Sequence, residues 1–306
     1  MVAMLELQFI IFALIGIGFL TRRKGMVSGE GQKNLTDIVI NIVLPCNIVT
    51  SFIQEFPEDA IQECIQIFLI SVGIQFFCLL YGKVAYPKET VERQKCLSYG
   101  IICSNAGFLG NPVAAGVYGP IGLALASVYL IPVRVMMWSE GVAVFSGQSD
   151  RKGAMKKIVT HPCVIACFLG IILMLTGTSM IPVTLLTLLQ TIGRCNTALS
   201  MMVIGMILSA IDPHNLIDAT VARYTVERLL LIPGVIWIVM RFLTRAGLAT
   251  GIVPGLSVLL AAMPAGATTS MLAAKYDCDP EFGTRMVILS TLCSIPTRFL
   301  WSMLMT

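Results

Sequence analysis

Charged residues are scarce in this chain of 306 residues: Lys, Arg, Asp and Glu make up 12% of it, against about 25% in a soluble protein. Hydrophobic residues make up 56%. A water-soluble fold of this size could not cover so much hydrocarbon, because its surface needs more charge. The composition therefore predicts an all-α integral membrane protein, in which each spanning helix uses about 20 mainly apolar residues.

Other functional classes lack their signatures. The net charge of +4 is too small for a nucleic-acid partner, and no basic run carries interleaved aromatics. Ten cysteines match no metal or redox spacing, so we expect no metal site and no cofactor. No nucleotide-binding loop occurs, so ATP-driven transport would need a separate subunit. The two histidines, His161 and His214, lie in or beside predicted inner loops, which argues against an intramembrane enzyme.

The apolar N-terminal stretch is expected to be the first membrane span. The basic cluster Arg22, Arg23 and Lys24 follows it, whereas a cleaved signal peptide carries its basic residues in front. Hydropathy then predicts ten spans. They cover residues 5–21, 35–54, 64–82, 97–118, 121–146, 159–177, 181–210, 224–242, 253–273 and 283–305.

The basic residues predict the orientation of these spans. Sixteen of the 21 Lys and Arg residues fall in alternate loops or at the span ends beside them, among them Arg223 and Arg228, while only Arg241 and Arg245 fall in or beside the others. Such a bias marks the cytoplasmic side. We therefore expect a multi-pass protein of the cell (plasma or inner) membrane with both termini outside. The remaining three basic residues fall within spans: Arg134, Arg194 and Arg298.

An odd number of spans per half inverts the second half relative to the first. The sequence therefore predicts a first five-helix repeat at 1–148 and a second, inverted five-helix repeat at 149–306, together one membrane domain. The clearest sign of an internal repeat is the pair of interrupted spans four and nine, with Pro112 in one and Pro264 in the other.

Those two spans are candidates for the functional site. Span four carries Asn105, Asn111 and Pro112, and span nine carries Pro264 followed by Thr268 and Thr269. Proline interrupts a helix, and a helix broken at mid-membrane leaves free N–H groups and a partial positive charge at its new N-terminus. A matched pair of broken spans points to a transporter site for an anion, although the freed carbonyls could equally hold a cation, and kinks or close packing are the alternative.

Neighbouring spans add polar candidates. Asn47 and Asn196 could project toward the breaks or form hydrogen bonds between helices. Arg134 could bind a substrate carboxylate, or could form a structural ion pair with Glu140 six residues further along. Arg298, near the outer end of span ten, could extend its charged group to the membrane surface.

The broken spans resemble the auxin efflux carrier family, which includes plant auxin carriers and bacterial malate and malonate permeases. The matching stretches are SNAGFLGNP at 104–112, AMPAG at 262–266 and AAKY at 273–276, with further likeness in spans two and seven. The resemblance implies a ten-helix inverted-repeat transporter, a homodimer with a scaffold part and a moving transport part. It also implies that Asn105 opens the break in span four and that Pro112 and Pro264 mark the crossing.

The leading interpretation is a secondary-active carrier of small organic anions. The junction between the halves is short, as in the bacterial permeases, which favours mono- or dicarboxylates over auxin. The coupling ion, H⁺ or Na⁺, is not readable from the sequence. A sodium-coupled carrier similar to bile-acid symporters, and an ion channel or sensor, are the alternatives, since broken helices also build channels.

Overall fold

The computed structural model describes residues 2–53, 60–146, 160, 162–176, 181–209, 218–266 and 268–305, and within them every regular element is a helix. The all-α prediction is confirmed, and each predicted span contains helix. His161, His214 and much of the predicted junction between the halves lie outside the described residues.

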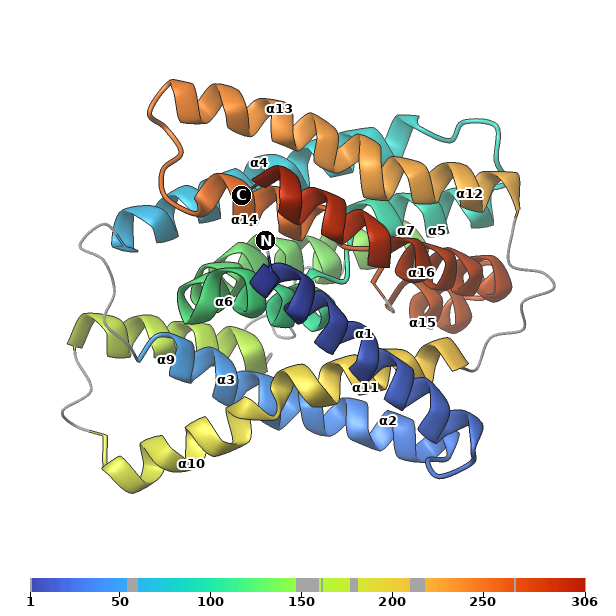
Figure 1. The fold of residues 1–306 in the computed structure, drawn as a ribbon. Helices are drawn as coiled ribbons and strands as arrows, with labels where there is room; N and C mark the ends of the chain where they lie inside the picture. Colours follow the sequence, from blue (N-terminus) through green and yellow to red (C-terminus); the bar gives the residue numbers. More distant parts are fainter. Residues whose placement is uncertain are drawn as a thin grey trace. The chain divides into compact units, whose positions relative to one another are not determined.

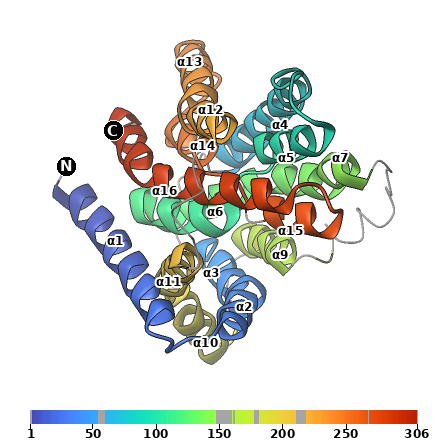
Figure 2. The same cartoon turned by 90° about the vertical axis from the view of Figure 1, so that its right-hand side faces the viewer.

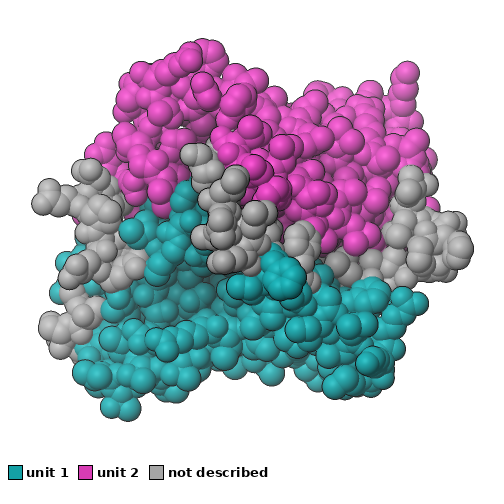
Figure 3. All heavy atoms as spheres, in the orientation of Figure 1, with its two compact units in different colours: residues 1–58, 111–127, 160–212 teal, residues 59–110, 128–159, 213–306 magenta. Residues whose placement is uncertain are grey.

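The chain forms two compact units, and each unit draws on both halves of the sequence (Figure 3). Unit 1 comprises residues 1–58, 111–127 and 160–212, and unit 2 comprises 59–110, 128–159 and 213–306. The units therefore differ from the predicted repeats, which remain a prediction.

The helices of unit 1 are α1 (Val2–Arg23), α2 (Gly29–Ile38), η1 (Val39–Val43), α3 (Leu44–Ser51), α9 (Pro162–Thr176), α10 (Val183–Arg194) and α11 (Asn196–Ser209), with the first part of α6 (Asn111–Met136). Those of unit 2 are α4 (Ala60–Val84), α5 (Val91–Ile102), η2 (Ala106–Gly110), the end of α6, η3 (Met137–Gly141), α7 (Val142–Ser146), α12 (Ala219–Val226), η5 (Glu227–Leu231), α13 (Ile232–Arg245), α14 (Val253–Ala261), α15 (Thr268–Lys275) and α16 (Pro280–Met305) (Figure 1).

Several of these helices are built to face lipid. Within the described residues, four continuous helical stretches are long and apolar enough to cross a membrane: Gly29–Ser51, Ile61–Val84, Ala106–Phe145 and Pro280–Leu304. Large apolar side chains on α4 and α9, such as Phe76 and Phe168, are more than half exposed. Exposed hydrocarbon on this scale is expected of a surface in contact with lipid chains.

The short π-helical turns η1, η2 and η5 each precede a proline at the same distance. Pro45, Pro112 and Pro233 each stand two residues after the end of η1, η2 or η5. A proline has no N–H and clashes with the preceding turn, so the helix widens there instead of ending. In η5, the indole of Trp301 donates to the Leu229 carbonyl at 2.8 Å. Pro233, four residues after Leu229, has no N–H that could donate to this carbonyl.

In unit 1, α1 and α11 pack along each other at glycines (Figures 1 and 2). A Cβ on Gly18 would overlap the carbonyl oxygen of Met202, and a Cβ on Gly205 would overlap that of Ile15. Small residues allow two membrane helices to approach this closely. The close approach adds dispersion contacts, which hold helices together inside a bilayer because the hydrophobic effect does not drive their association there.

We predict that Gly205→Ala destabilises the protein by about 1–3 kcal/mol, the usual range for overpacking, and lowers its melting temperature in detergent. The matched control is Gly16→Ala on α1, since a Cβ there meets nothing within 4 Å. Equal melting temperatures for the two variants would contradict this packing.

Candidate functional site

The breaks in spans four and nine are paired with each other in unit 2. The helix α5 ends at Ile102 and α14 ends at Ala261, and an extended segment follows each. The Asn105 N–H donates to the Pro264 carbonyl at 2.8 Å, and the Gly266 N–H donates to the Cys103 carbonyl at 3.0 Å. The two segments thus form one short antiparallel bridge, centred on Ser104 and Ala265.

The residue types in the second segment suit this pairing. Pro264 has no N–H, and here it serves only as an acceptor. A Cβ on Gly266 would come within 3.2 Å of the Cys103 carbonyl oxygen, so a larger residue would push the segments apart. The Ala265 N–H donates at 3.2 Å to the hydroxyl of Ser290 on α16. Backbone groups that the breaks release are therefore satisfied within the unit.

Helices begin again directly after the crossing. The Asn105 carbonyl accepts from the N–H groups of Leu109 and Gly110, at 3.0 and 3.2 Å, and so opens the η2 turn as the resemblance implies. On the other side α15 begins at Thr268. Both helix N-termini add partial positive charge beside the crossing, which favours an anion.

Arg134 lies next to the η2 turn. Its Nη2 atom is 3.7 Å from the position that a Cβ on Gly107 would take, its side chain is nearly buried at 5% exposure, and its Nη1 has no hydrogen-bond partner among the described residues. The alternative of an ion pair with Glu140 is not supported, because Glu140 is exposed and lines a groove with Lys83 on α4. A buried guanidinium without a carboxylate is costly unless other groups compensate its charge, and a bound anion is one such group.

Comparison with known protein sequences shows to which family this chain belongs. A sequence profile of the membrane transport protein family matches residues 3–302. The chain belongs to this family, the auxin efflux carriers. An uncharacterized transporter of Methanothermobacter thermautotrophicus is 28% identical over 96% of each chain. One of Methanocaldococcus jannaschii is 26% identical over 97% of each. A Rhizobium meliloti protein, named "Putative malonate transporter", is 22% identical over 94% of this chain and 91% of its own.

The other predicted site residues of this membrane transporter divide between the units. Asn111, the first residue of α6, is fully buried and neither of its amide atoms has a partner among the described residues. Thr269 is also buried with an unpaired hydroxyl. Asn47 and Asn196 belong to unit 1: Asn47 packs against Gly193, while the side-chain carbonyl of Asn196 accepts from the Ser200 hydroxyl at 3.2 Å.

Two predictions about arginines are wrong. Arg298 does not reach the membrane surface; it is 1% exposed and its Nε donates to the Ser294 carbonyl at 3.0 Å on its own helix. Arg228 does not lie in a loop; it is part of η5 and is 3% exposed. The sequence offered one signal for Arg228, since the apolar run of span eight begins before it rather than after it.

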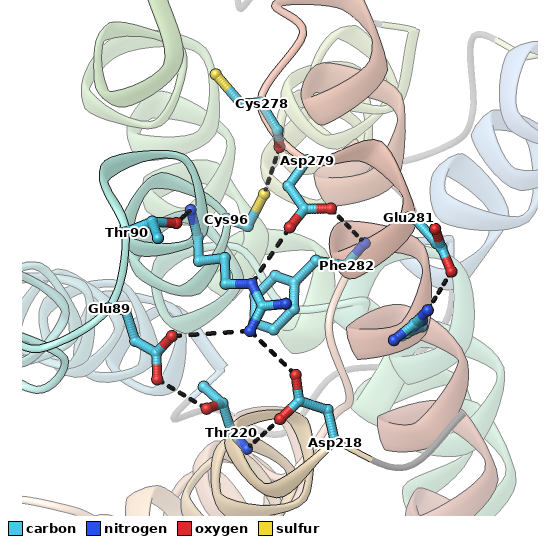
Figure 4. A network of polar contacts seen from close by, with 11 residues as sticks. Glu89, Thr90, Cys96, Asp218, Thr220, Cys278, Asp279, Glu281 and Phe282 are labelled. Atoms are coloured by element: carbon cyan, nitrogen blue, oxygen red, sulfur yellow. Dashed lines mark hydrogen bonds and ion pairs between the residues drawn. The ribbon is translucent and has the colours of Figure 1, made fainter. Parts of the chain in front are cut away.

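Three helices of unit 2 meet at Arg93, whose contacts with Asp218 and Asp279 belong to the polar network in Figure 4. Asp218 and Asp279 cap the N-termini of α12 and α16 with one carboxylate oxygen, which accepts from backbone N–H groups. The other carboxylate oxygen of each binds Arg93, at 3.1 Å for Asp218 and 3.3 Å for Asp279. Arg93 also lies over the ring of Phe282, with Glu89 at 3.9 Å. One arginine therefore ties the starts of α5, α12 and α16 together.

From Arg93 these helices run side by side toward the crossing. Seven residues along α5, a Cβ on Gly100 would come within 2.6 Å of the Tyr224 hydroxyl on α12 and 2.9 Å of Met286 on α16. One turn beyond Met286 is Ser290, which binds Ala265 in the crossing. The ion pairs of Arg93 thus align the three helices along their axes, and this alignment decides which residue of each helix lies beside the broken segments.

Groups around this end carry shifted pKa values. Burial, together with the hydrogen bond that its hydroxyl donates to Glu227, raises the pKa of Tyr86 above its usual range. Burial, and secondarily the charge of Asp279, raises the pKa of Cys96 to about 12, so this thiol stays neutral. The hydrogen bond from Arg223 to Glu227, 2.7 Å long, raises the pKa of Arg223. Near neutral pH the Tyr86 hydroxyl is therefore uncharged and Arg223 is protonated.

We predict that Arg93→Gln costs about 1–2 kcal/mol, the sum expected for partly exposed ion pairs and a cation–π contact, and lowers the melting temperature of the purified protein. The matched control is Glu281→Gln, which removes the more exposed pair between Arg285 and Glu281 on α16 alone. A melting temperature for Arg93→Gln that matches the control would show that the network does not join the three helices.

Proposed function

We propose that this transporter is a secondary-active carrier of small organic anions, with the substrate bound at the crossing of the broken spans. The observation that carries the proposal is the place of Arg134: a buried guanidinium with an unpaired nitrogen beside the η2 turn, which begins where one of the two crossed segments ends. The guanidinium and the N-terminus of the helix that starts with η2 both attract negative charge in a region with little water. The name of the Rhizobium meliloti relative supports a carboxylate as the anion.

The proposal includes the finer architecture. Ten spans in two inverted five-helix repeats, with both termini outside the cell, would place the crossing near the bilayer midplane, where such transporters bind their substrates. Alternating access would then come from movement of the part that carries the crossing. A homodimer is the assembly that the family resemblance suggests.

Transport by the purified protein in proteoliposomes tests the proposal. A panel of labelled mono- and dicarboxylates, with pH and sodium gradients imposed separately, reports the substrate class and the coupling ion together. A carrier gives saturable uptake and counterflow. Flux that rises linearly with concentration would instead indicate a channel, and failure to move any carboxylate would overturn the anion assignment.

We predict that Arg134→Gln reduces carboxylate uptake by about 10- to 100-fold, because a hydrogen bond to a charged group contributes about 1.5–3 kcal/mol. Uptake per molecule of protein inserted is the quantity to compare. Arg241→Gln is the matched control, since Arg241 lies over the ring of Trp237 on an exposed part of α13. Wild-type uptake by the Arg134 variant would place the substrate elsewhere.

Asn105→Ala and Pro264→Ala are each expected to impair transport while membrane insertion stays normal. The first removes the side-chain amide at the crossing and keeps the backbone bonds of Asn105, and the second adds a backbone N–H and flexibility to the segment that pairs with it. Asn41→Ala is the control for the first, because that exposed side chain bonds only within its own helix, to the Asp37 carbonyl. Normal uptake kinetics in both variants would refute the crossing as the site.

A further inference from the structure

A groove in unit 2 separates α4 from the second part of α6 and from η3. Its volume is about 510 Å³, within the range of about 300–1,000 Å³ that small-molecule sites occupy. The walls are mainly apolar and include the exposed side chains of Phe76 on α4 and Val135 on α6. Gln75 also lines the groove, but it is buried. Two charged residues, Lys83 on α4 and Glu140 on η3, complete the lining at one end.

Each of these charged residues is next to a glycine that packs on α5. A Cβ on Gly82 would lie 3.3 Å from the Cα of Ser98, whose hydroxyl donates to the Gly82 carbonyl at 2.7 Å. A Cβ on Gly141 would lie 2.8 Å from the ring of Tyr99. Because Ser98 and Tyr99 are consecutive on α5, the two glycines lie at the same position along this helix. Their charged neighbours therefore reach the end of the groove together.

Lys83 and Glu140 do not neutralise each other. Both side chains are exposed, and no ion pair found within the described residues involves either of them. Lys83 stands one residue past the predicted third span, and the polar stretch 88–93 follows it. This end of the groove is therefore expected at the membrane surface. An ionised side chain beside lipid is stabilised by a group of opposite charge, which a headgroup can supply.

An apolar groove that ends in one cation and one anion is complementary to a zwitterionic phospholipid. An acyl chain would cover the exposed walls, the phosphate would lie beside Lys83, and a primary ammonium would donate charge-assisted hydrogen bonds to Glu140. A glycerol headgroup would leave Glu140 beside a negative charge. A choline headgroup has the positive charge but no N–H to donate. The two side chains thus favour an ethanolamine headgroup.

We propose that the groove between α4 and α6 binds a phospholipid with an ethanolamine headgroup, whose phosphate contacts Lys83 and whose ammonium contacts Glu140. The inference goes beyond the proposed function, since it involves neither the crossing nor the transported anion. A second groove, between α4 and α13, has a volume of about 430 Å³, and none of the described residues that line it is charged. That groove has no means of selecting a headgroup, so it serves as an internal reference.

Native mass spectrometry of the purified protein tests the selectivity. The protein is titrated with ethanolamine, choline and glycerol phospholipids that carry identical acyl chains, and the Kd of the first bound lipid is compared. We expect the ethanolamine lipid to bind about threefold or more tightly than either of the others, because an exposed ion pair contributes up to about fivefold in affinity. Equal affinity for the ethanolamine and choline lipids, or no individual binding of any lipid, would overturn the inference.

Charge variants assign the headgroup contacts. Glu140→Gln should abolish the preference for ethanolamine over glycerol phospholipid, because the repulsion of the glycerol lipid disappears with the attraction of the ammonium. Lys83→Gln should weaken binding of both lipids. The matched controls are Glu92→Gln and Lys88→Gln, which remove exposed charges near the same end of α4 and α5 and should keep the wild-type preference. A preference that survives Glu140→Gln, or that the controls also abolish, refutes the assignment.

A pair of filling variants locates the lipid. Val72 lines the proposed groove and Val239 lines the groove between α4 and α13, and each is 45% exposed. Val72→Trp should weaken binding of the ethanolamine lipid by about tenfold and remove its preference, because the indole occupies the path of the acyl chain. Val239→Trp should leave the preference unchanged. The same loss in both variants, or a loss in Val239→Trp alone, would place the lipid outside this groove.

Discussion

Two broken helices in a membrane leave backbone groups that water cannot reach, and each unsatisfied group there costs several kcal/mol. In this protein the bonds from Asn105 to Pro264 and from Gly266 to Cys103 satisfy such groups by joining one break to the other. Neither break would be stable alone. The pairing therefore determines where η2 and α15 begin, and it places Gly107 against Arg134.

The remainder of unit 2 supports that pairing. Ser290 on α16 takes the Ala265 N–H, and the register of α16 is set in turn by Asp279 and Arg93 at the far end of the same helix. A chain of side chains thus connects the end of the unit that carries Arg93 to the crossing. Any movement of unit 2 as a body would carry the crossing with it, which is the behaviour that alternating access needs.

Much of this could be predicted from the sequence, because hydropathy and proline act locally. Apolar runs located the helices, and Pro264 lies within one break. Pro112 does not lie in the other break, because it stands in α6 after η2, where the helix continues. The hydrogen bonds between the breaks depend on residues about 160 positions apart, so no local pattern gives their register. Arg228 was assigned to a loop because basic residues at the edge of an apolar run usually lie outside the membrane, whereas here the helix continues inward and buries it. Arg298 was placed within span ten and expected to extend toward the membrane surface, whereas its Nε donates to the Ser294 carbonyl of its own helix.

The central claim is that an organic anion binds at the crossing through the buried guanidinium of Arg134. A cryo-electron microscopy structure of the protein with bound malonate tests it most directly. The account predicts density for the ligand between the Arg134 guanidinium and the segment around Ser104 and Asn105. Density for malonate that contacts neither the crossing nor Arg134 would contradict it.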